Sequence, residues 1–107
     1  MGIEKVPVLD EHDQVKGNVA KSLDDYKDFE RAEVVVWEAA LHKSLGVRKK
    51  EQDKIKNQAG GEEAHEEKLK NDAKYRADWE GHADRIVIEE KAYDLAQEWI
   101  ENKDNKK

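Results

Sequence analysis

Only two stretches of the sequence carry a continuous apolar stripe, and both have the spacing of an α-helix. When each residue advances by ~100° around a helix axis, apolar side chains in residues 23–45 and in residues 84–102 gather on one face. The first face holds Leu23, Tyr26, Phe29, Ala32, Val36, Trp37, Ala39, Ala40 and Leu41. The second holds Ile86, Ile88, Ala92, Tyr93, Leu95, Ala96, Trp99 and Ile100. We therefore expect two core helices, since no other segment offers a comparable face.

The apolar content is only just sufficient for a folded core. Leu, Ile, Val and Phe account for 21 of 107 residues, which is close to the ~20% below which disorder is favoured. Charged residues make up 43% of the chain, and its formal net charge is -6. The absence of cysteine excludes a disulfide framework, a thiolate metal site and a cysteine nucleophile. These features predict a single, mostly all-α domain over residues 1–107, with three to four helices.

The first half of this domain divides at a capping signal. Residues 1–21 contain the only proline, which is excluded from a helix interior, so we expect an extended arm or a short hairpin there. Ser22 and Asp25 then have the spacing of a capping box, which marks the start of a helix. The first core helix is accordingly expected over residues 22–46, with Gly46 as the residue that ends it.

The second half of the domain contains a pair of adjacent glycines that predicts a turn. Residues 47–80 are rich in helix-forming and charged residues, and Gly60 and Gly61 lie at their centre. We expect these residues to form a polar helical hairpin that projects from the core or lies loosely on it. Residues 82–102 should form the second core helix, and the lysine-rich residues 103–107 a frayed tail.

Basic residues cluster in residues 43–58, which carry six basic and two acidic groups. The six basic residues are Lys43, Arg48, Lys49, Lys50, Lys54 and Lys56. Residues 41–57 also have the leucine, glycine and valine spacing of a degenerate helix-turn-helix. However, His42 stands where that motif needs a small residue, and Gln52 stands where it needs a buried aliphatic one. We favour a solvated basic face that meets an acidic partner, and nucleic-acid binding is the alternative.

Two aromatic residues of the polar hairpin do not join an apolar stripe. Tyr75 and Trp79, with Leu69 one or two turns away, are surrounded by charged residues. Aromatic side chains in such surroundings are enriched at protein-binding hot spots, so these three residues form a candidate partner-binding patch. The alternative is that they cover the open side of the small core.

Several charged residues fall within the two apolar faces. Glu30 and Glu33 lie on the first face, and Arg85 and Glu89 lie on the second. Burial of an unpaired charge costs several kcal/mol, so these groups must lie at the edge of the interface or pair across it. We expect a bridge of the Glu33–Arg85 type that fixes the register of the two helices.

No set of residues in the sequence has the spacing of a catalytic or metal-binding site. Glu62 and His65 have the three-residue spacing used in di-metal helical bundles, but the sequence contains this pair only once. We therefore predict no catalytic site, no metal site and no cofactor.

The resulting functional prediction is a non-enzymatic module that binds a partner protein through its charged helical arm, as an adaptor or inhibitor. Its size and charge would suit an accessory protein of a phage or mobile element. Alternatives are the DNA-binding regulator described above and a homodimer in which two copies complete each other's weak stripe. With no apolar run near the ~18–20 residues of a membrane span, we expect a cytoplasmic protein without membrane contact.

Overall fold

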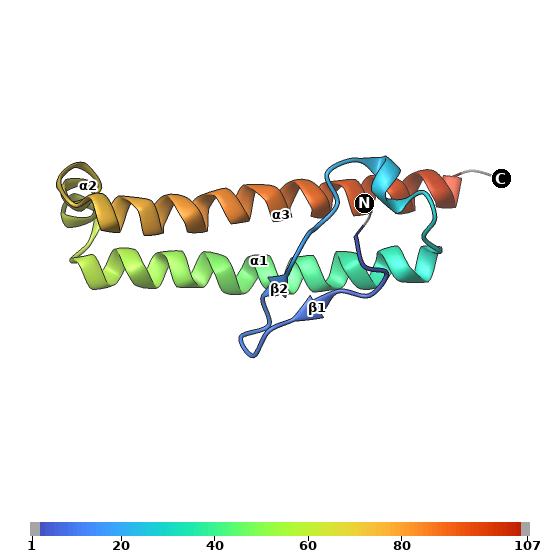
Figure 1. Cartoon of the computed structure of the whole chain (residues 1–107), viewed down its shortest axis with the longest axis horizontal. Coiled ribbons are helices and arrows are strands. Elements are labelled where there is room, and N and C mark those ends of the chain that lie inside the picture. The colour runs from blue at the N-terminus through green and yellow to red at the C-terminus, as the bar shows by residue number, and fades with distance from the viewer. Residues whose placement is uncertain (1–2, 106–107) are drawn as a thin grey trace.

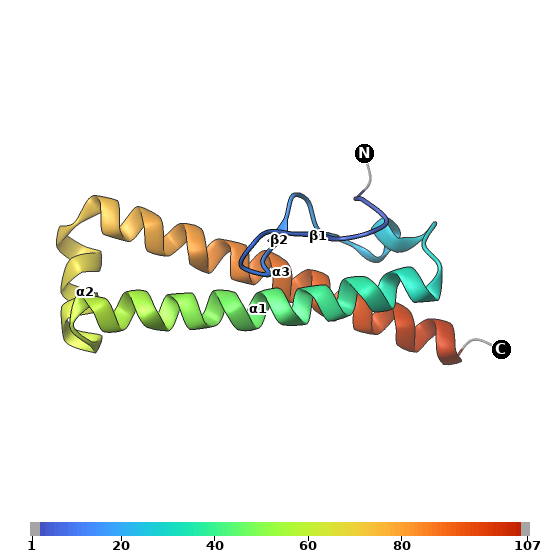
Figure 2. The same ribbon diagram turned by 90° about the horizontal axis from the view of Figure 1, so that it is seen from below.

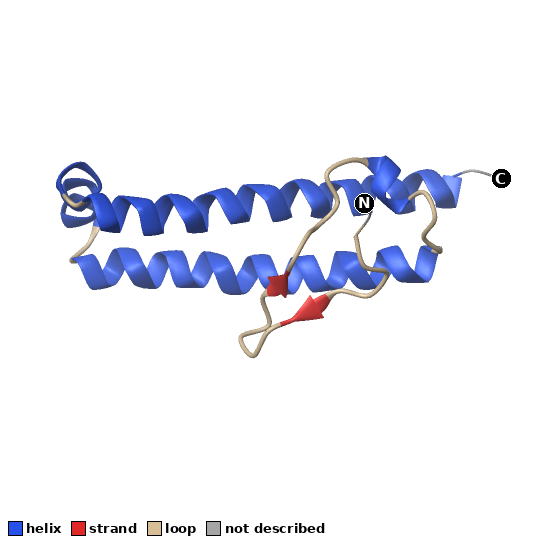
Figure 3. Cartoon of the chain, viewed as in Figure 1, coloured by secondary structure: helices blue, strands red, loops and turns tan. Residues whose placement is uncertain are grey.

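A computed structural model describes residues 3–105 and shows a mostly α-helical domain, as the sequence predicts. It contains three α-helices: α1 (Arg31–Ala59), α2 (Glu62–Asn71) and α3 (Ala73–Asn105). The two short strands and the 3-10 helix all precede α1 (Figure 3).

The long helices α1 and α3 lie side by side and run in opposite directions (Figure 1). The molecule measures 54 × 26 × 22 Å, and its longest dimension follows this pair of helices. Seen from below, α1 and α3 cross at a shallow angle and separate toward the end where α2 connects them (Figure 2). The expected turn at Gly60 and Gly61 is confirmed, because the left-handed Gly60 (φ 114°) ends α1 and Gly61 precedes α2.

The N-terminal part of the chain, residues 3–30, forms a strap across α1 and α3 (Figure 1). It begins with an antiparallel hairpin of β1 (Val8–Leu9) and β2 (Val15–Lys16), in which Leu9 faces Val15, so the hairpin form of the expected arm is confirmed. The Asp10 carboxylate accepts hydrogen bonds from the backbone N–H groups of Gln14 (3.0 Å) and His12 (2.8 Å). The bond from Gln14 is the main reason why the pKa of Asp10 lies below its usual range.

The apolar core lies where the strap crosses the two long helices. Its buried members are Val15, Val19, Ala20, Tyr26, Phe29, Val34, Trp37, Ala40, Leu41, Ala92 and Ala96. Two side chains of the core also bond to main-chain oxygens: the Trp37 Nε1–H donates to the Glu4 carbonyl (2.9 Å) and the Tyr26 hydroxyl to the Ala92 carbonyl (3.3 Å). The strap therefore supplies a third layer that a pair of helices alone would lack.

The expected boundaries of the first core helix are wrong at both ends. The Asp25 carboxylate does accept hydrogen bonds from the N–H groups of Lys21 and Ser22, but this capping box starts only the short 3-10 helix η1 (Leu23–Tyr26). α1 begins eight residues beyond Leu23, at Arg31, and continues through Gly46. A glycine inside a helix costs only ~0.5–1 kcal/mol, which the contacts of the following turn offset.

The second core helix is also longer than expected. α3 begins at Ala73, so residues 73–80 of the polar hairpin belong to the same helix as the core residues 82–102. A single extended residue, Asp72 (φ -117°, ψ 102°), separates α2 from α3. At the other end α3 continues to Asn105, and the last two residues of the expected frayed tail lie outside the described residues.

The helix faces are rotated slightly from the expected ones. Val36 and Ile88 are 48% and 42% exposed, although both were assigned to the apolar arcs. Val34, which the expected arc does not include, is fully buried instead. Because the strap covers one side of the helix pair, the buried face of each long helix is set by the strap as well as by the other helix.

Candidate functional site

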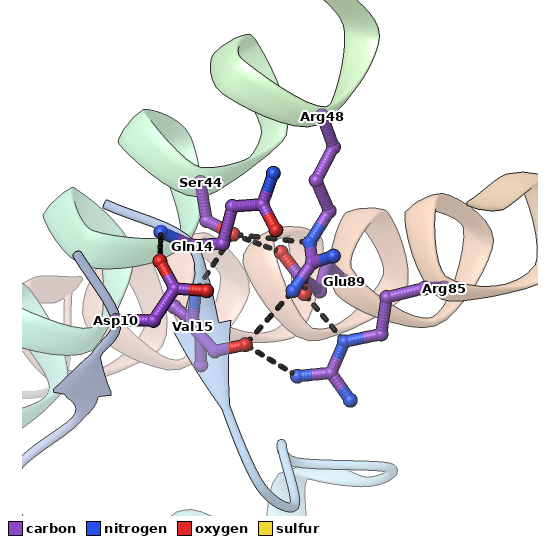
Figure 4. A network of polar contacts seen from close by, with 7 residues as sticks. All are labelled: Asp10, Gln14, Val15, Ser44, Arg48, Arg85 and Glu89. Carbon is purple, nitrogen blue, oxygen red and sulfur yellow. Dashed lines mark hydrogen bonds and ion pairs between the residues drawn. The ribbon is translucent and has the colours of Figure 1, made fainter. Parts of the chain in front are cut away.

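A buried carboxylate joins α1, α3 and the strap (Figure 4). Glu89 of α3 is fully buried, and its Oε1 accepts a hydrogen bond of 2.6 Å from the Ser44 hydroxyl. Its Oε2 lies 2.6 Å from the Nε of Arg85 and 2.8 Å from the Nε of Arg48. We call Ser44, Arg48, Arg85 and Glu89, together with the main chain of Val15, the clasp.

The same two arginines hold the strap. The Val15 carbonyl accepts hydrogen bonds from the Nη2 groups of Arg48 (2.9 Å) and Arg85 (3.0 Å). The Val15 N–H in turn donates to the Ser44 hydroxyl (3.0 Å). Charge-assisted bonds of this kind are about twice as strong as neutral ones, and here they link segments that lie far apart in the sequence.

The expected Glu33–Arg85 bridge is wrong. Glu33 lies at the start of α1, where its Oε1 accepts a hydrogen bond of 2.8 Å from the Glu30 N–H as part of a capping box, and it lies 3.8 Å from the Lys5 ammonium. Arg85 pairs with Glu89, one turn along its own helix. The general expectation that the charges pair across the interface still holds, because Arg48 and Ser44 approach Glu89 from α1.

The sequence reasoning missed Ser44 and Arg48 as partners of Glu89. One signal was present, since Arg85 and Glu89 stand four residues apart on an otherwise apolar face, a spacing that suits an ion pair on a helix. No pattern in the sequence near Ser44 and Arg48 indicates that these residues contact Glu89. It depends on the register of two helices that meet only in the folded chain.

The basic residues of positions 43–56 are mostly neutralised within the chain. Four of the six lie within 4.0 Å of a carboxylate or contact one directly: the pairs are Lys43–Asp13, Arg48–Glu89, Lys49–Glu90 and Lys56–Glu62. The hydrogen bond between Lys56 and Glu62 raises the pKa of Lys56 and lowers that of Glu62. Lys50 and Lys54 are exposed. These pairs connect α1 to the strap, α2 and α3, which makes the basic cluster a set of structural contacts.

The helix-turn-helix given as the alternative for residues 41–57 does not form. The structure has one continuous helix from Arg31 to Ala59, and Gly46, the expected turn, lies inside it with an ordinary helical conformation. The motif needs a turn between two separate helices, and the continuous α1 provides neither the turn nor a separate recognition helix. Nucleic-acid binding by the exposed lysines stays a prediction, and it no longer has the support of this motif.

The three candidate partner-binding residues lie at the far end of the long helices, and two of them form a small cluster with α2. His65 of α2 is 5% exposed, and its Nδ1 lies 2.7 Å from the Tyr75 hydroxyl. The Trp79 ring packs edge-on against the His65 ring, with centroids 4.2 Å apart. Leu69, Tyr75 and Trp79 are each half-buried. Tyr75 and Trp79 therefore attach α2 to α3, and their contact with a partner stays a prediction.

Glu62 and His65 each have another role in the fold. Glu62 pairs with Lys56, and the His65 ring contacts Tyr75 and Trp79. Within residues 3–105, no group of three or more histidine, aspartate or glutamate side chains is placed to hold a metal ion.

No protein-family model matches the chain, and neither a curated protein nor a solved structure shows significant similarity to it. In the described part of the chain, no helix has the length and apolar character that crossing a membrane requires. Function is therefore inferred from the geometry of the molecule itself.

Proposed function

We propose that the protein is a non-enzymatic interaction module that binds a partner protein through residues 47–80, which we call the arm. The arm comprises the second half of α1, all of α2 and the first turns of α3. In this proposal the core and the strap hold the arm in place, and the module acts as an adaptor or an inhibitor of its partner.

The observation that carries the proposal is that almost none of the arm is buried. Of its residues, all of which the structure describes, only His65 is buried, whereas the apolar core is confined to the part of the molecule that the strap crosses. Ordering a residue costs ~1–2 kcal/mol of backbone entropy, so a long projection with little burial contributes little to stability. Such a projection is suited to contact with another molecule.

The polar groups of the clasp do not suggest a reaction. Glu89 is fully buried and is held by Ser44, Arg48 and Arg85, so its carboxylate is not positioned to take a proton from a substrate. These contacts support a structural use of the clasp and a non-enzymatic module.

The proposal is tested by affinity capture from a lysate of the organism that encodes the chain, with and without nuclease. The arm variant carries Lys50→Glu and Lys54→Glu, which are exposed positions on α1. The matched control carries Lys21→Glu and Lys91→Glu, which are also exposed but lie outside the arm. Both variants make the same change in net charge, so a difference between them reports the location of binding.

We expect a stoichiometric protein partner that survives nuclease, is lost from the arm variant and is retained by the control. Equal retention by both variants would contradict binding through the arm. Recovery of nucleic acid alone, or loss of every partner after nuclease treatment, would favour the DNA-binding alternative.

A further inference from the structure

The outer sides of the two long helices carry opposite charges. On the side of α1 that faces away from α3, the exposed residues include Ala39, Lys43, Gly46, Lys50, Asp53 and Lys54, which we call the basic edge. On the side of α3 that faces away from α1, they include Glu80, Asp84, Val87, Lys91, Asp94 and Glu98, which we call the acidic edge. Both sets lie opposite the buried residues of their helix, such as Leu41 and Glu89. Because α1 and α3 lie side by side, the two edges are on opposite sides of the molecule (Figure 1).

Each edge offers a pair of charges with the same spacing. Lys50, Lys54, Glu80 and Asp84 take part in none of the ion pairs found within residues 3–105. The two lysines are four residues apart, and so are the two carboxylates, so each pair spans about one helical turn. If the two edges packed in opposite directions, Lys50 would face Asp84 and Lys54 would face Glu80.

The same register brings an exposed apolar side chain to a position without a side chain. Gly46 lies one turn before the lysine pair, and a Cβ atom built there meets nothing within 4 Å. Val87 lies one turn after the carboxylate pair and is 66% exposed. Burial of Val87 against Gly46 would add apolar area to ion pairs that contribute little at a surface. The next turn brings Lys91 beside Lys43, whose charge Asp13 balances at 3.6 Å.

We propose that the protein associates with copies of itself, with the basic edge of one copy packed antiparallel against the acidic edge of the next. Because the two edges lie on opposite sides of the molecule, a two-fold dimer cannot form both contacts, and the assembly extends as a chain or closes as a ring. Exposed ion pairs are weak, and a net charge of -6 on every copy opposes association, so the contact is a weak one. The inference goes beyond the proposed function, since it requires no other protein.

The test reverses each pair of charges in the purified full-length chain. The first variant carries Lys50→Glu and Lys54→Glu, so both of its edges present carboxylates at the contact. The second carries Glu80→Lys and Asp84→Lys, so both of its edges present lysines there. Their net charges are -10 and -2, four on either side of -6, so overall attraction between opposite charges cannot bring them together. All four positions are exposed, and circular dichroism checks that both variants fold.

Sedimentation equilibrium measures the average mass of each sample. We expect the mass of the unchanged chain to rise with concentration beyond that of a dimer. Each variant alone should associate at least about tenfold more weakly, whereas their equimolar mixture should come within about threefold of the unchanged chain. Lys21→Glu with Lys74→Glu is the matched control, since it equals the first variant in net charge and alters exposed residues outside both edges. It should associate as the unchanged chain does.

A pair of glycine variants tests the register. Gly46→Leu places a side chain where Val87 should pack, and we expect it to weaken association by about tenfold. Gly81→Leu is the control, because Gly81 is also a helical glycine with open space at Cβ but lies outside the acidic edge. Both variants should fold, since each replaces a helical glycine by a good helix former. Equal association of the two would contradict the register.

Three results would overturn the inference. They are a chain that stays monomeric at about 1 mM, a mixture that associates no more than the separate variants, and a mass that stops at that of a dimer. If the purified chain stays monomeric while the Lys50/Lys54 variant loses its partner in the capture experiment, the basic edge binds the partner protein. The proposed function would then stand without self-association.

Discussion

At the scale of single residues, Glu89 is the buried charge that joins α1 to α3. Its carboxylate is fully buried and neutralised by two arginines, and its removal would leave two guanidinium groups without the negative charge that they share. The desolvation of such groups, more than the attraction within the pair, determines the cost of a single substitution.

We predict that Glu89→Ala lowers the free energy of unfolding by about 3–5 kcal/mol, which is a large part of the stability of a small domain. Equilibrium unfolding in urea measures this change. Glu90→Ala is the matched control, since Glu90 is exposed and forms only a 3.8 Å contact with Lys49, so its loss should cost about 0–1 kcal/mol. Equal effects of the two substitutions would show that the clasp does not stabilise the fold.

The residue scale is also where the sequence predicted least. Periodicity placed Arg85 and Glu89 on an apolar face and correctly required a partner for them. It could not show that Glu33 is used as a cap at the start of α1, nor that Ser44 and Arg48 reach Glu89 from the facing helix. Such contacts depend on the rotation of each helix about its axis, and this rotation is set by the strap.

At the scale of the elements, helix formation and the turn at Gly60 and Gly61 followed from the sequence, whereas the helix ends did not. Ser22 with Asp25 and Glu30 with Glu33 are two successive capping boxes, and only the second starts a long helix. Gly46 was expected to end the first core helix because glycine favours helix termini. The helical residues that follow it, and the contact of Arg48 with Glu89, outweigh that preference.

Two glycines of this region should respond to alanine in opposite ways. Gly46→Ala should raise the free energy of unfolding by about 0.5–1 kcal/mol, because the helical glycine has open space at Cβ. Gly60→Ala should lower it by about 1–2 kcal/mol, because Gly60 has a positive φ and its Cβ would lie 3.1 Å from that of Ala64. Urea unfolding of both variants checks the signs, and stabilisation by Gly60→Ala would contradict the turn.

The contact between the start of α1 and the end of α3 should make stability depend on pH. Arg31 donates to both carboxylate oxygens of Asp104, at 2.7 and 3.0 Å, and this bonding lowers the pKa of Asp104 in the folded chain. The unfolded state therefore binds more protons near the ordinary aspartate pKa. The stability supplied by this contact is present above that value and is lost as the pH falls through the folded pKa.

We predict that Asp104→Asn weakens the fall of Tm that occurs between about pH 5 and pH 2. Thermal unfolding followed by circular dichroism at several pH values measures the slope. Glu101→Gln, a neighbouring exposed position on α3, serves as the control for the loss of one carboxylate. A slope unchanged by Asp104→Asn would contradict the contribution of this contact.

At the scale of the whole molecule, the fold is elongated, with the core in one half and the arm in the other. The radius of gyration of the Cα atoms is 16.5 Å, whereas a compact domain of this length would have ~13 Å. We predict that small-angle X-ray scattering gives a radius clearly above ~13 Å for the monomer. A value near the compact limit would show that the arm folds back, and a doubled mass in light scattering would favour the homodimer.

The clasp also has a consequence for the order in which the chain can fold during synthesis. Val15 leaves the ribosome early, but its carbonyl bonds to Arg48 and to Arg85, which lie 33 and 70 residues downstream. Closure of such distant contacts is slow, and Glu89, which holds both arginines, is translated after both of them. The N-terminal segment therefore stays unlocked until the chain has been made at least as far as Glu89.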